Sequence, residues 1–317
     1  MFTALDTTDE RTFKALTGLT HAAFEALLVH FATSYAETIK DQYDKNKAKR
    51  KRQPGGGRKG RLNSLKKKLF FVLYYLKTYP TFDVLGDHFG MDRSKACTNL
   101  HRLFSILLRA LKQADVLPER HFTSPEEIQA AFAGILELFI DATERPQQRP
   151  QDGEAQSKKY SGKRKRHMVK NTVISSAAKQ ILFLGYTVFG SEHDYSLLKT
   201  EFDPKTDWFA TFKLWVDLGY LGIKTDYKAL EIHIPHKTPR KSEANPEPSL
   251  SPEQKMDNRA VSQMRIVVEN AICRMKRFRG VTDVFRNRKN NFVDDIALAA
   301  AGLANWLLAQ QTEAAAA

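Results

Sequence analysis

The spacing of hydrophobic residues divides the chain into a helical first part and a mixed second part. Over 1–44 the apolar residues recur at helical spacing, at Phe13, Leu16, Leu19, Phe24, Leu27, Leu28 and Phe31. This pattern predicts an N-terminal helical region that packs as a small subdomain. Helical spacing returns after residue 68 and continues to about 112.

The segment 69–122 is predicted to be a helix-turn-helix domain. Thr81 can cap a short helix that Gly90 ends, and Asp92 can cap a second helix that runs from Arg93 to about Leu111. Gly86 and Ala96 supply small side chains where two such helices would cross. The second helix would present donors suited to phosphates and base edges, namely Arg93, Ser94, Lys95, Thr98, Asn99 and Arg102. An ordinary helical hairpin with a polar face is the alternative.

From residue 123 the pattern changes to strands, which predicts one mixed α/β domain over 123–309. Short apolar runs end at Asp141 and at Asp217. Between them two strand-like segments are joined by 176–179, which is short enough for a hairpin. A proline-containing polar stretch predicts a loop insertion at about 224–258, before a long helix that ends near Phe278. Residues 310–317 are expected to form a disordered tail.

Charge indicates the class of partner. The chain has 317 residues, with 50 Lys and Arg against 36 Asp and Glu, a net charge of +14. Such an excess favours a polyanion, with nucleic acid first and an anionic membrane surface second. The most apolar stretch, 296–309, is interrupted by Gly302 and Asn305, so no membrane association is expected.

The chain termini and cysteines indicate the compartment. The acidic N-terminus does not resemble a signal peptide, and Cys97 and Cys273 alone predict neither a zinc site nor a disulfide framework. A reducing, cytoplasmic compartment with association to DNA is therefore expected.

Two basic segments are predicted to contact the DNA backbone. Residues 45–68 hold twelve Lys or Arg and no acid, with Pro54 and three glycines in the middle, which predicts a flexible arm or linker. Residues 158–170 hold seven more Lys or Arg. The expected contacts are Lys49, Arg50, Lys51, Arg52, Arg58 and Lys59 in the arm, and Lys163, Arg164, Lys165 and Arg166 in the second segment. A solvated linker and a solvated edge strand are the plainer interpretations.

Three carboxylates are the strongest candidates for chemistry. Asp141 and Asp217 each follow a buried strand, and if those strands are neighbours, both side chains face one crevice. Buried carboxylates are costly unless they are paired or bind a metal, and an oxygen-only ligand set suits Mg²⁺ or Mn²⁺. Glu269 lies on one face of the long helix with Arg265 and Lys276. Two ions held by these acids would catalyse in-line phosphoryl transfer.

The order of these motifs resembles that of DDE transposases. The motifs are Asp141-Ala-Thr-Glu, the basic run 159–167, Gly190-x-x-His193-Asp194, Asp217-Leu-Gly-Tyr220 and Arg265-x3-Glu269-x6-Lys276. They are similar to those of a bacterial insertion-sequence group, the insertion-sequence-five branch related to Harbinger elements. The resemblance covers roughly 69–309. Ser262 departs from it, because related families often place Tyr there.

The resemblance implies an RNase H-like catalytic domain and an activity. The activity would be binding of terminal inverted repeats, DNA cleavage and strand transfer without a nucleotide cofactor, carried out by a dimer on DNA. It also implies Asp141, Asp217 and Glu269 as ligands of two Mg²⁺ or Mn²⁺ ions, with Arg265 and Lys276 as basic catalytic partners. His193 and Asp194, which we expect at the end of a strand, are secondary candidates.

Two other functions are compatible with the same residues. A domesticated endonuclease would keep the acids and cut DNA without transposing it. A non-enzymatic helix-turn-helix regulator would keep only the DNA contacts.

Overall fold

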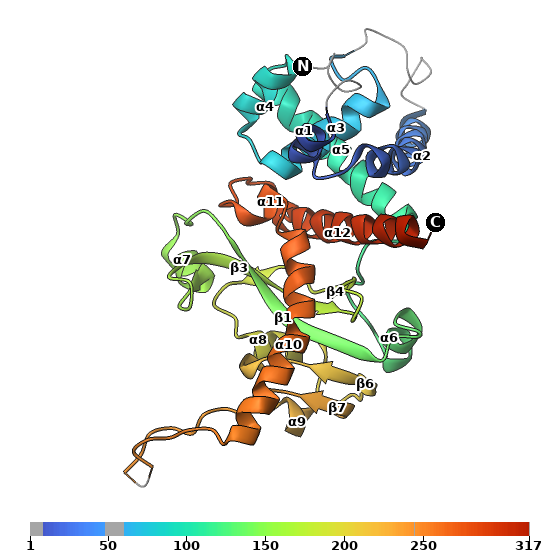
Figure 1. Ribbon diagram of the computed structural model, residues 1–317. Coiled ribbons are helices and arrows are strands. Elements are labelled where there is room, and N and C mark those ends of the chain that lie inside the picture. The colour runs from blue at the N-terminus through green and yellow to red at the C-terminus, as the bar shows by residue number, and fades with distance from the viewer. Residues whose placement is uncertain (1–8, 48–59, 244, 317) are drawn as a thin grey trace. The chain divides into compact units, whose positions relative to one another are not determined.

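The computed structural model describes residues 9–47, 60–243 and 245–316, and its contacts divide the chain into two compact units (Figure 1). The first unit comprises 1–117 and 275–317, and the second comprises 118–274. The expected catalytic domain ran on to 309, but the last part of the chain packs with the N-terminal helices instead. Its long apolar helix completes their core.

The described part of the first unit is helical. Its helices are α1 (Glu10–Thr17), α2 (His21–Asn46), α3 (Leu65–Thr78), α4 (Phe82–Phe89), α5 (Arg93–Gln113), α11 (Arg279–Thr282) and α12 (Phe292–Ala316). The helical prediction for 1–44 is thus confirmed for the described residues. The basic arm was expected over 45–68, but α2 reaches Asn46 and α3 begins at Leu65. The predicted arm contacts Lys49, Arg50, Lys51, Arg52, Arg58 and Lys59 lie outside the described residues.

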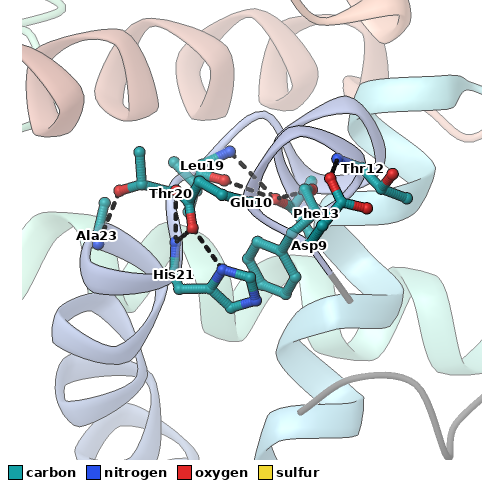
Figure 2. A network of polar contacts seen from close by, with 9 residues as sticks. Asp9, Glu10, Thr12, Phe13, Leu19, Thr20, His21 and Ala23 are labelled. Carbon is teal, nitrogen blue, oxygen red and sulfur yellow. Dashed lines mark hydrogen bonds and ion pairs between the residues drawn. The ribbon is translucent and has the colours of Figure 1, made fainter. Parts of the chain in front are cut away.

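Side-chain caps set the start of the first helices. Asp9 accepts a hydrogen bond from the Thr12 N–H at 3.0 Å, and Thr20 accepts one from the Ala23 N–H at 3.1 Å (Figure 2). His21 bonds back to Glu10 and stacks on Phe13. These contacts fix the turn between α1 and α2.

Among the described residues, one single helix is long and apolar enough to cross a membrane, Phe292–Thr312 within α12 of the first unit. Of its most apolar window, 61% is buried inside the protein. Ala300, Ala301 and Leu303 are fully buried, and Asn305 donates to the Val116 carbonyl at 3.0 Å. The apolar composition of α12 is therefore explained by its place in the core of the first unit. Because α12 continues to Ala316, the disordered tail expected over 310–317 is wrong for the described residues.

The helix-turn-helix elements are confirmed, with the predicted caps. Thr81 and Asp92 cap α4 and α5, and Gly90 ends α4 in the left-handed conformation, with φ 65°. A Cβ on Gly86 would lie 2.5 Å from the Met91 carbonyl oxygen, so only glycine permits this approach.

The second unit is built on a mixed sheet. Its strands are β1 (Glu137–Pro146), β2 (Tyr160–Ser161), β3 (Arg166–Ser175), β4 (Ile181–Leu184), β5 (Val188–Phe189), β6 (Phe209–Trp215) and β7 (Ala229–His233). The order is β2-β3-β1-β6-β7, and β4 and β5 also pair with β3. β1 is antiparallel to β3 and parallel to β6, and β6 is parallel to β7.

Helices flank this sheet, as the RNase H-like class implies, so the predicted fold class is confirmed. They are α6 (Pro125–Ala131), α7 (Gly153–Lys159), α8 (Asp194–Glu201), the 3₁₀ turn η3 (Leu218–Tyr220), α9 (Ile223–Asp226) and α10 (Pro252–Met275). One face of the sheet forms the apolar core, where Ile140, Leu214 and Val216 pack with α8 and η3 side chains.

Two local predictions in this unit have different outcomes. The hairpin at 176–179 is confirmed, because β3 and β4 pair antiparallel across it. The loop insertion at about 224–258 is wrong over part of its range, since it contains β7 and the start of α10. In β7, apolar and polar residues alternate over only five positions, which is too short a pattern to distinguish the strand from the polar sequence around it.

We predict that Gly86→Ala destabilises the first unit, although alanine normally stabilises a helix interior by about 1 kcal/mol. The added methyl group would displace the Met91 backbone, and the free energy of unfolding should fall by about 1–3 kcal/mol. Chemical denaturation measures it. Gly60→Ala is the control, because no atom of the described residues lies within 4 Å of its Cβ position. Equal stability of the two variants would contradict the close approach.

Candidate active site

The parallel pairing of β1 with β6 brings Asp141 and Asp217 to the same face of the sheet. Phe139 pairs with Trp215, and each aspartate lies two residues further along its chain. Asp217 follows the last residue of β6 closely, as expected. Asp141 was expected to end its strand, but β1 continues to Pro146 because β3 pairs with it beyond the point where β6 ends. The two carboxylates therefore lie at the end of the β1–β6 ladder.

Backbone groups orient both carboxylates. The Asp141 Oδ1 accepts a hydrogen bond from the Ala142 N–H at 2.8 Å. The Asp217 Oδ1 accepts one from the Gly219 N–H at 2.6 Å, and so caps η3. Each carboxylate keeps its second oxygen for another partner.

That partner is Arg265 of α10. One terminal guanidinium nitrogen, NH2, lies 3.7 Å from an oxygen of Asp141 and 3.7 Å from an oxygen of Asp217. The side chains are largely buried, with 15% of Arg265 and 20% of Asp141 exposed. A cation therefore lies between the two carboxylates, where their mutual repulsion is greatest.

The Asp141 carboxyl is the perturbed titrating group of this site. Burial is the main cause that raises its pKa to about 6, and repulsion from Asp217 and Asp194 acts in the same direction. The Ala142 N–H and Arg265 act against that rise. Burial and like charges disfavour the ionised form of Asp141, so a further positive charge nearby would stabilise it.

Glu269 is not brought into this cluster. It lies one turn after Arg265 on α10, and its side chain is exposed. Within the described residues, no group of three or more His, Cys, Asp or Glu is close enough to hold a metal ion. Asp141 and Asp217 fit a divalent cation by donor chemistry and by shared orientation, whereas the Glu269 contribution is not formed here. Lys276 follows the last residue of α10 and belongs to the first unit.

His193 and Asp194 begin α8 and do not end a strand, which corrects our expectation. The helix starts where Asp194 contacts Lys170 of β3. This contact between distant segments leaves no pattern in the neighbouring sequence. Asp194 Oδ1 lies 2.7 Å from the Lys170 Nζ, and Asp194 also contributes to the raised pKa of Asp141. Asp194 is thus electrostatically part of the same cluster.

Lys170 and Glu144 were missed as site residues. Lys170 is 5% exposed in the middle of β3, and its ammonium group lies 3.7 Å from Glu144 and donates to the Glu192 carbonyl at 2.6 Å. Glu144 also accepts from Ser161 at the end of β2 and from Arg164 in the turn between β2 and β3. The sequence did offer a signal for Lys170, because a lysine inside an apolar strand needs a partner for its charge.

Most of the predicted DNA contacts within the described residues are exposed. Lys163, Arg164, Lys165 and Arg166 are exposed in or beside the turn between β2 and β3. On α5, Arg93, Ser94, Lys95, Thr98 and Arg102 are exposed, and Asn99 is half-buried. Cys97 and Cys273 are free thiols, as expected.

Comparison with known proteins defines the class. A model of the DDE superfamily endonucleases matches residues 140–305, which is more than half of the chain, and a helix-turn-helix model of the same superfamily matches 60–113. The chain therefore belongs to the DDE superfamily endonucleases.

One relative of this chain is a probable transposase for insertion sequence element IS702 from Microchaete diplosiphon. It is 29% identical over 259 residues, which cover 81% of this chain and 85% of the relative. The comparison with solved structures found no significant match. The family resemblance predicted from the motifs is confirmed, and the Harbinger-related branch stays a prediction.

We predict that Asp141→Asn stabilises the metal-free protein above pH 6. The folded carboxyl has a pKa of about 6 against an ordinary value of 3.8, so folding disfavours its charged form. The cost is absent below pH 3.8, grows as pH rises to about 6 and is constant above it. The variant should gain up to about 3 kcal/mol at pH 8 and little at pH 4, measured by denaturant unfolding in EDTA. Exposed Asp207→Asn is the control, and a pH-independent gain would contradict the electrostatic origin.

Proposed function

We propose that this protein is a DNA transposase that binds the terminal inverted repeats of its element, cleaves DNA there and joins the 3′-OH ends to target DNA. The observation that carries the proposal is the placement of Asp141 and Asp217 on one face, with Arg265 at 3.7 Å from each. A DDE endonuclease model over that region and a helix-turn-helix model before it support the same conclusion.

In this proposal Asp141, Asp217 and Glu269 would hold two Mg²⁺ or Mn²⁺ ions. The ions would supply an acidified water or 3′-hydroxyl and would neutralise the leaving oxygen. The residues of the chain would bind the ions, orient the aspartates and neutralise the scissile phosphate. The Ala142 and Gly219 N–H groups orient the two aspartates. Arg265, and Lys276 after it, would neutralise the scissile phosphate.

The helix-turn-helix and the β2–β3 hairpin would supply the DNA affinity. The N-terminal part of α5 presents Arg93, Ser94, Lys95, Thr98, Asn99 and Arg102. Lys163, Arg164, Lys165 and Arg166 would contact the backbone near the cleavage site, and the arm residues 49–59 would add phosphate contacts. Cleavage of two ends requires two active sites, so we propose a dimer on DNA that needs no nucleotide cofactor.

We predict that Asp141→Asn, Asp217→Asn and Glu269→Gln each lower Mg²⁺-dependent nicking by at least about 100-fold, because each removes charge stabilisation worth several kcal/mol. The assay is strand cleavage of a duplex that carries the element's inverted repeat, with and without EDTA. Glu253→Gln removes an exposed acid from the first turn of the same helix and should nick normally. Full activity in Asp141→Asn would sink the proposal, and nicking without any strand-transfer product would favour the domesticated endonuclease.

We predict that Arg93→Ala and Arg102→Ala weaken DNA binding and reduce the slope of log affinity against log salt. The reduction should be about 0.9 for each phosphate that the variant no longer neutralises. Binding is measured at several salt concentrations. Arg109→Ala is the matched control on the same helix, because Glu37 and Asp41 already hold that guanidinium at 2.8 Å each. An unchanged slope in both test variants would exclude α5 as the DNA-contacting helix.

A further inference from the structure

Three aromatic rings form a stack across the face of the sheet that carries Asp141 and Asp217. Phe139 of β1 stacks on Trp215 of β6 with centroids 5.9 Å apart and an interplanar angle of 8°. Trp215 stacks in turn on His233 of β7, at 3.9 Å and 14°. The strand register aligns all three, because Phe139 pairs with Trp215 and Trp215 with His233.

Phe139 is fully buried, whereas Trp215 and His233 are half-buried and lie outside the apolar core between the sheet, α8 and η3. Strand alternation places these rings on the face opposite Ile140, Leu214 and Ile232, which pack in or against the core. The Trp215 indole N–H donates to the Glu137 carboxylate at 3.3 Å, and 30% of the His233 side chain is exposed. The last ring of the stack is therefore accessible at the edge strand of the sheet.

A pocket of about 450 Å³ opens beside this last ring. Trp215 of β6 and His233 of β7 line it from the sheet, His236 lines it from the segment after β7, and Asp257, Ala260 and Val261 line it from α10. Lys224 also lines the pocket, has an exposed side chain and makes no ion pair within the described residues. The volume suits a ligand of small-molecule size and excludes a duplex.

This pocket adjoins the proposed cleavage site on both of its walls. Trp215 precedes Asp217 by two residues, about 7 Å along an extended chain. Val261 precedes Arg265 by one helical turn, about 6 Å along α10. A DNA strand whose phosphate lies at Arg265 would thus bring the next nucleotide to the pocket.

We propose that the pocket binds one unpaired nucleotide of the DNA strand next to the scissile phosphate. The base stacks on the His233–Trp215 platform, and Lys224 contacts its phosphate. The planar rings provide the base surface, and Lys224 provides a cation at the rim. The carboxylate in the lining, Asp257, is paired with His236 at 3.1 Å. The inference rests on the proposed function, since it names the ligand of the neighbouring subsite.

The test is photo-crosslinking of DNA that carries 5-iodouracil at single positions flanking the cleavage site, with the crosslinked residue mapped by mass spectrometry. Two duplexes are compared, one with the labelled nucleotide unpaired and one with it paired. We expect crosslinks to Trp215 or His233 for one unpaired position, and at least about fivefold less for the paired duplex. His233→Ala and Lys224→Ala should each weaken binding of the unpaired duplex at least about fivefold and leave the paired duplex unchanged.

Tyr186→Ala is the control, since Tyr186 is an aromatic residue with 58% exposure that does not line the pocket. Crosslinks to other residues, equal crosslinking of both duplexes, or a peptide or second copy of the chain in the pocket would overturn the proposal. Nicking of the same duplexes is measured in parallel. Crosslinking without nicking would count against the proposed catalysis and for the pocket, whereas nicking without these crosslinks would count against the pocket alone.

Discussion

The burial of a carboxylate beside a second one is the constraint on which the acidic cluster of the second unit depends. The parallel pairing of β1 and β6 places Asp141 and Asp217 on one face, and the backbone N–H groups of Ala142 and Gly219 hold them there. The raised pKa of Asp141 expresses the free-energy cost of this arrangement. Arg265 offsets part of it from α10. A site that stores such a cost is suited to attract cations.

The same principle extends to the residues around the pair. Asp194 adds negative charge to the cluster and is itself balanced by the buried ammonium of Lys170, which also lies near Glu144. Glu144 in turn binds Ser161 and also Arg164, which lies in the turn of the basic hairpin. Charges of alternating sign thus run from Arg164 of the hairpin through Glu144 of β1 and Lys170 of β3 to Asp194. These ion pairs anchor the hairpin, with its exposed cations, beside the site.

The two faces of the sheet divide structure from chemistry. One face is apolar and packs with α8 and η3, and it holds the strands in register. The other carries Asp141 and Asp217 with their Arg265 ion pairs, and the Phe139–Trp215–His233 stack. Because side chains alternate along a strand, a single register decides which residues reach the chemistry. The first unit shows a comparable division along α5, where buried leucines alternate with exposed donors.

Local signals in the sequence determined the helix-turn-helix, the hairpin at 176–179 and the candidate acids. Caps such as Thr81 and Asp92, the small Gly86 and the charges that interrupt apolar runs act over a few residues, so they can be read without a fold. Only the tertiary structure decided that α12 completes the first unit, that β1 continues past Asp141 and that His193 and Asp194 begin a helix. It alone paired Lys170 with Asp194, left Glu269 exposed and aligned three rings from separate strands. These outcomes depend on contacts between distant segments, whose free energies have no counterpart in local spacing.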